Sequence, residues 1–119
     1  MPSERPAQRL QDIIDSIDDA TAFIGGVADT AAINQDRKTL RAVERCFQII
    51  SEAAIKLGAE AERLCPGLPW ADIRGIGNPL RHEYDVISPA RLWQSIRDDL
   101  PPLRAACVQA LKTHFGDDG

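Results

Sequence analysis

"TLRAVERCFQIISEAAIKLG", residues 39–58, is the stretch that decides the fold. Its apolar residues follow one another at intervals of three and four positions, which is the spacing of one face of an α-helix. They are Leu40, Val43, Phe47, Ile50, Ala54 and Leu57. So narrow a stripe is typical of a helix that packs against another helix, and Gly58 is suited to end it. Glu52 lies beside the stripe and is either an exposed helix residue or a partly buried carboxylate.

Two more segments, residues 6–25 and 88–115, show the same helical periodicity. The second of them contains Pro101 and Pro102. Because proline removes a backbone hydrogen bond and clashes with the preceding helical turn, we expect a kink or a break near Leu100. The chain therefore has three long helical segments, and the last of them is interrupted.

The sequence between the second and the last long helical segments indicates shorter elements. Residues 65–70, CPGLPW, are typical of a connector, and residues 70–77, WADIRGIG, favour a short helix. No alternating pattern typical of strands appears, so we expect an all-α, up-down helical bundle formed by residues 1–119 as a single domain. Its apolar stripes are generous for so small a bundle and include the large side chains of Phe47 and Trp93. A homodimer that buries a second face is therefore plausible.

Composition narrows the classes of function. The net charge is −4 and the pI is about 5.1, which argues against a broad nucleic-acid-binding surface but leaves room for a small basic site. Cys46, Cys65 and Cys107 are far apart, as expected of buried thiols in a reducing compartment. We expect no metal and no cofactor. The polar N-terminus and the absence of a long apolar run indicate a soluble, cytoplasmic protein without a membrane partner.

The stretch GIGNPLRHEYD, residues 75–85, concentrates the chemistry. Asn78 is placed to cap a helix that has Pro79 in its first turn. The free backbone N–H groups of such a helix start favour an anion, and phosphate is the obvious candidate. Arg74, Arg81 and His82 lie close by in the sequence.

His82 is the residue of this stretch that can give and take a proton near neutral pH. The pattern by itself leaves two interpretations open. His82 is either a general acid and base, or a histidine that makes a hydrogen bond at a corner between helices.

Residues 70–103, WADIRGIGNPLRHEYDVISPARLWQSIRDDLPPL, resemble the HepT-like branch of the HEPN superfamily. Members typically have a tryptophan, then isoleucine-x-glycine, arginine-asparagine and leucine-x-histidine-x-tyrosine, and continue through a tryptophan-containing helix that ends in DLP-x-L. The upstream stretch RAVERCFQIISEAAIKL, residues 41–57, is similar to another helix of the family. The likeness extends from about Arg41 to Leu103, and its landmarks come in the right order.

The resemblance implies a dimeric helical bundle that acts as an RNA endonuclease toxin without a metal ion, in a type VII toxin–antitoxin system of the HepT/MntA kind. It also implies a partner, a small nucleotidyltransferase antitoxin that attaches AMP to a tyrosine and so blocks the site. By this resemblance Asn78 matches the polar residue of the catalytic signature, His82 matches its histidine, and Tyr84 matches the modified tyrosine.

The chain departs from the family pattern at Gly77, which stands where the catalytic arginine is expected. Arg74 and Arg81 are the nearest replacements. Arg74 reaches forward from the preceding short helix, whereas Arg81 adjoins His82 and would contribute across a dimer axis. If neither replaces the missing arginine, the protein is a catalytically impaired interaction module that binds a nucleotidyltransferase or a nucleotide.

Overall fold

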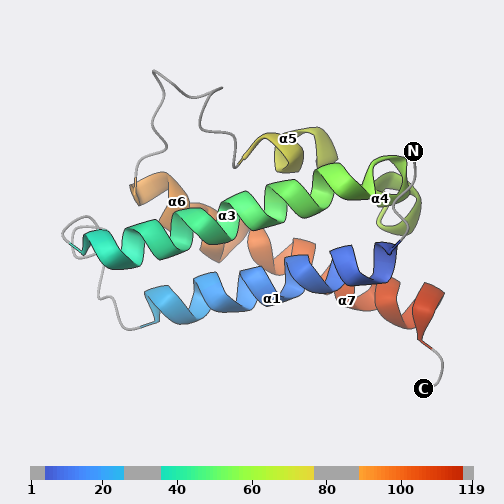
Figure 1. Ribbon diagram of the computed structural model, residues 1–119, viewed down its shortest axis with the longest axis horizontal. Helices are drawn as coiled ribbons and strands as arrows, with labels where there is room; N and C mark the ends of the chain where they lie inside the picture. The colour runs from blue at the N-terminus through green and yellow to red at the C-terminus, as the bar shows by residue number, and fades with distance from the viewer. Residues whose placement is uncertain (1–4, 26–35, 77–88, 117–119) are drawn as a thin grey trace.

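The computed structural model describes residues 5–25, 36–76 and 89–116, and within these ranges every regular element is a helix (Figure 1). The helices are α1 (Pro6–Ile24), α3 (Arg37–Leu57), α4 (Ala59–Leu64), α5 (Trp70–Gly75), α6 (Pro89–Asp98) and α7 (Leu100–Phe115). The chain runs along α1 in the direction opposite to α3 and α7 (Figure 1). The prediction of an all-α bundle is confirmed.

Helices α1 and α3 form the main packing interface of the bundle, and α7 covers α1 from another side. The stripe predicted on α3 is buried, except that Leu40 is only partly covered. It meets apolar side chains of α1, and each fully buried aliphatic side chain contributes roughly 1.5–3 kcal/mol. The α1 side chains in the core are Leu10, Ile13, Ile14, Ile17, Ala20 and Ile24.

Helix α3 begins and ends at residues suited to those positions. Asp36 is the N-cap, and its carboxylate accepts hydrogen bonds from the backbone N–H of Thr39 at 3.1 Å and from its hydroxyl at 2.6 Å. Gly58 ends the helix with φ of 56°, a left-handed backbone that favours glycine. Glu52 is 55% exposed and lies 3.7 Å from Arg45, so the exposed alternative is correct.

The interruption expected in the last helical segment lies at Asp99, between α6 and α7. Pro101 and Pro102 occupy the first turn of α7, where a missing backbone N–H costs little. The Asp99 N–H still donates to Ser95 at 2.8 Å, so α7 follows directly after α6. The predicted break near Leu100 is confirmed.

All three cysteine thiols are free and buried, as the sequence predicted. Burial raises the pKa of the Cys46 thiol to about 11, and the nearby carboxylate of Asp19 acts in the same direction. This thiol is therefore protonated at neutral pH and packs as a small apolar side chain. Among the helices that the structure describes, none combines the length and the apolar character needed to span a membrane.

Candidate functional site

Four of the five predicted site residues, Asn78, Arg81, His82 and Tyr84, lie outside the described residues, as does Gly77. Their roles stay predictions. The structure does describe both elements that border residues 77–88 in the chain, which are α5 before them and α6 after them. It also describes Arg74, the fifth predicted residue, which lies in the last turn of α5.

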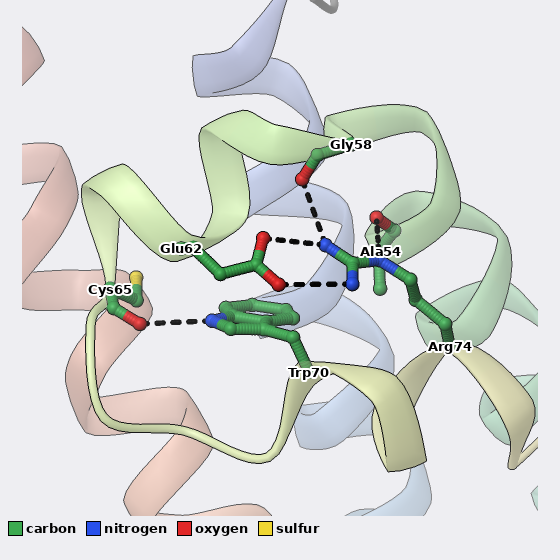
Figure 2. Close-up of polar contacts among 6 residues, drawn as sticks. All are labelled: Ala54, Gly58, Glu62, Cys65, Trp70 and Arg74. Carbon is green, nitrogen blue, oxygen red and sulfur yellow. Dashed lines mark hydrogen bonds and ion pairs between the residues drawn. The ribbon is translucent and has the colours of Figure 1, made fainter.

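Helix α5 is short, but it is fixed at its start by Trp70. The indole ring is 2% exposed, and its N–H donates to the carbonyl of Cys65 at 2.9 Å (Figure 2). The backbone N–H of Trp70 donates to Leu68 at 2.8 Å, and Ile73 is buried one turn further on. Trp70 and Ile73 are both in the core and hold this short helix against the bundle.

Arg74 joins α5 to the end of α3 and to α4 (Figure 2). Its guanidinium forms a bidentate pair with Glu62, with Nη1–Oε2 at 3.0 Å and Nη2–Oε1 at 2.8 Å. Nη2 also donates to the carbonyl of Gly58 at 2.8 Å, and Nε donates to that of Ala54 at 3.4 Å. On the backbone side, the Arg74 carbonyl accepts a hydrogen bond from the Ser51 hydroxyl at 2.5 Å.

These contacts shape the electrostatics of Arg74. The hydrogen-bonded pair raises the pKa of the guanidinium and lowers the pKa of the Glu62 carboxyl, so both groups are charged at neutral pH. The Arg74 side chain is 27% exposed, which leaves part of the guanidinium open to solvent. A phosphate that binds Arg74 must therefore share it with Glu62 or displace that carboxylate. Whether Arg74 replaces the missing arginine stays a prediction.

Neither Glu62 nor Ser51 was predicted from the sequence to be a partner of Arg74. They lie 12 and 23 residues away in the chain, beyond the reach of any local helical spacing. The sequence offers one local signal, the position of Glu62 in the stretch AEAER just before the connector. That signal does not single out Arg74 from the other arginines.

A groove of about 700 Å³ lies between α5, α6 and the start of α7. Its apolar lining includes Phe47, Ile73 and Leu92. The charged residues that line it within the described ranges are Asp72, Asp98, Asp99 and Arg91. Because aspartates outnumber the arginine among these described residues, they do not attract a polyanion to the groove.

The described residues also contain no cluster of three or more histidine, cysteine or acidic side chains suited to a metal ion.

Residues 13–110 match the family described as "Ribonuclease HepT-like". The chain belongs to this family, and the resemblance seen in its sequence is confirmed.

Two relatives illustrate the match. "Putative RNase MJ1380" of Methanocaldococcus jannaschii is 31% identical over 96 residues, which are 80% of this chain and 86% of that protein. "Probable ribonuclease HepT" of Thermococcus cleftensis is 33% identical over 69 residues, which are 58% of this chain and 63% of that protein. No solved structure matches the chain significantly.

Proposed function

We propose that the protein is a metal-independent RNA endonuclease of the HepT-like family. The observation that carries this proposal is the family match over residues 13–110, which spans the stretch from Asn78 to Tyr84. Relatives named as ribonucleases that align over most of their own length support the same conclusion.

The proposed reaction uses a nucleophile that RNA itself supplies, its 2′-hydroxyl. The 2′-oxygen forms a bond to the adjacent phosphorus while the bond from phosphorus to the 5′-oxygen breaks. His82 takes the proton from the 2′-hydroxyl or gives one to the departing 5′-oxygen. Asn78 and an arginine, Arg74 or Arg81, bind the phosphate and stabilise its developing charge.

The decisive test is incubation of the purified protein with RNA in EDTA. Cleavage that persists with the metal chelated supports the proposed nuclease, because the mechanism needs only side chains and the substrate's own hydroxyl. Intact RNA after long incubation with excess protein contradicts it.

The alternative is an interaction module that binds a nucleotidyltransferase without cutting RNA. Gly77 favours it, because this position lacks the arginine that the family pattern expects. The engagement of Arg74 by Glu62 favours it too, since the nearest upstream cation already has an anionic partner. The incubation in EDTA separates the two functions.

In the proposed toxin–antitoxin pair, a nucleotidyltransferase antitoxin transfers AMP from ATP to the Tyr84 hydroxyl and releases diphosphate. We expect co-expression with such an enzyme to add the mass of AMP to the protein. The variant Tyr84→Phe lacks the accepting oxygen and should keep its unmodified mass. Intact-protein mass spectrometry makes this measurement, and an unchanged wild-type mass beside an active partner would argue for a structural tyrosine.

We further propose a symmetric homodimer that brings residues 78–82 of the two chains to a shared cleft. Light scattering at micromolar concentration should give twice the mass of the 119-residue chain. The mass of a single chain at that concentration would count against the dimer and against any role of Arg81 across its axis.

A further inference from the structure

The solvent-facing side of α3 carries a run of positive charge in its first half. Lys38, Arg41 and Arg45 are spaced three and four residues apart, so they share one face of the helix. All three are exposed, and the buried residues of α3 lie on the opposite face. We call these three residues the α3 basic stripe. Residues 37–45 contain four cations and a single anion, in a chain whose net charge is −4.

Lys38, the first residue of the stripe, lies in the first turn of α3, where a cation does not stabilise the helix. The N-terminal end of a helix carries a partial positive charge, so cations in the first turns are unfavourable and acidic residues are preferred there. The first turn of α3 has no acidic residue, and the carboxylate of the Asp36 N-cap lies just before it. Lys56, Arg97 and Lys112 differ from the stripe, because each lies in the last turn of a helix, where a cation is favoured. The stripe therefore points to a bound anion more than to a contribution to folding.

We propose that the α3 basic stripe binds the phosphate backbone of an RNA strand, an inference that rests on the proposed ribonuclease function. With a rise of about 1.5 Å per residue, the stripe is on the order of 10 Å long, enough to follow consecutive phosphates. RNA phosphates supply the complementary charge without requiring any particular base sequence.

The stripe lies at the end of the bundle where α6 also begins (Figure 1). Residue 89, the first of α6, directly follows the stretch that contains His82. An RNA strand bound along the stripe therefore lies at the same end of the bundle as the start of α6. Among the described residues that line the groove between α5 and α6, aspartates outnumber arginine, and aspartates repel a phosphate backbone.

Arg45 has partners on its own helix that a phosphate must replace. Its Nη1 donates to Gln48 at 3.2 Å and lies 3.7 Å from the Glu52 carboxylate. Arg45 and Glu52 are both more than half exposed, and pairs of that kind contribute little to stability. Glu52 thus holds Arg45 only weakly, and the guanidinium can exchange this carboxylate for a phosphate at small cost.

The test uses cleavage-inactive protein, so that binding is measured without loss of substrate. In a His82→Ala background, the variant Lys38→Gln/Arg41→Gln/Arg45→Gln is compared with the control Lys56→Gln/Arg97→Gln/Lys112→Gln. Both triple variants change the net charge equally and alter only exposed side chains. The probe is a labelled single-stranded RNA, titrated at several salt concentrations.

We expect the stripe variant to bind the RNA about tenfold or more weakly at low salt. The slope of log affinity against log salt should fall by about 2, because each phosphate contact to a single strand contributes roughly 0.7. The control should bind within about twofold of its parent. The stripe variant should also unfold at about the same temperature as its parent, since its substitutions alter only exposed side chains, whose ion pairs contribute little to stability.

If the stripe variant keeps the RNA affinity and the salt slope of its parent, the proposal that the stripe binds RNA is wrong. Cleavage of RNA by the wild type would then still support the proposed nuclease. Equal weakening in both triple variants would overturn RNA binding by the stripe as well, by showing a general effect of charge. Loss of nucleotidyltransferase binding with RNA binding retained would assign the stripe to a protein partner instead. Absence of RNA binding and of cleavage in the wild type would remove the proposed function and the stripe together.

Discussion

Replacement of His82 with alanine is expected to lower RNA cleavage by roughly 100- to 10,000-fold, the usual contribution of a positioned general acid or base. The measurement is the rate of RNA cleavage in EDTA under single-turnover conditions. His114→Ala is a matched control, because His114 is the other histidine of the chain and is exposed in the last turn of α7. It should cleave at the wild-type rate.

Induced expression tests the same role in cells. A toxin that cleaves RNA should arrest growth, and His82→Ala should restore growth at an equal level of protein. If purified His82→Ala cleaves as fast as the wild type, His82 is structural, as the second interpretation of the sequence had it, and another group transfers the proton.

The second large effect concerns the cation that compensates for Gly77. If Arg74 supplies it, Arg74→Ala should lower cleavage about as severely as His82→Ala, with the loss mainly in the turnover rate. Gly77→Arg should preserve or raise cleavage. Wild-type rates in both Arg74→Ala and Arg81→Ala would show that neither arginine replaces the missing one. If the wild type does not cleave RNA but Gly77→Arg does, the protein is a nuclease scaffold that lacks its phosphate-binding arginine.

The structure adds a control to this experiment, because Arg74→Ala also removes the bonds to Glu62, Gly58 and Ala54. We expect this variant to lose about 1–3 kcal/mol of unfolding free energy, measured by urea denaturation. Glu62→Gln removes the opposing charge while Arg74 stays. If Arg74 binds phosphate, Glu62→Gln should keep or raise cleavage, because a competitor for the guanidinium has been weakened. If Arg74 acts only by holding α5 in place, cleavage should fall in both variants.

The long helices could be predicted from the sequence because their signals are local. The spacing of Val43, Phe47 and Ile50 specifies which face of α3 is buried, and two adjacent prolines specify where the last segment breaks. Gly58 was predicted to end α3. That a second helix, α4, begins at the next residue was not, because six residues are too few to show a periodicity.

The contacts of the candidate site could not be predicted from the sequence, and the reason is physical. The bonds of Arg74 to Glu62 and to Ser51 depend on how α3, α4 and α5 fold back on one another, and no sequence interval encodes that arrangement. The sequence could nominate Arg74 as a cation near the motif, but it could not show what the guanidinium already binds. The motif and the family to which the chain belongs are the basis for the roles proposed for Asn78, Arg81, His82 and Tyr84.

Because α7 packs on α1, the chain cannot complete its core during synthesis until α7 has been made. Leu103 and Cys107 of α7 complete the core, and Arg104 pairs with Asp18 of α1, 86 residues earlier in the chain. Until α7 is synthesised, α1 and α3 can pair but leave an apolar side uncovered. A premature stop within α7 would thus release a chain that carries the entire stretch around His82 on an unfinished core. We expect such a chain to be removed by proteolysis before it accumulates, so that the proposed nuclease becomes active only once α7 has been made.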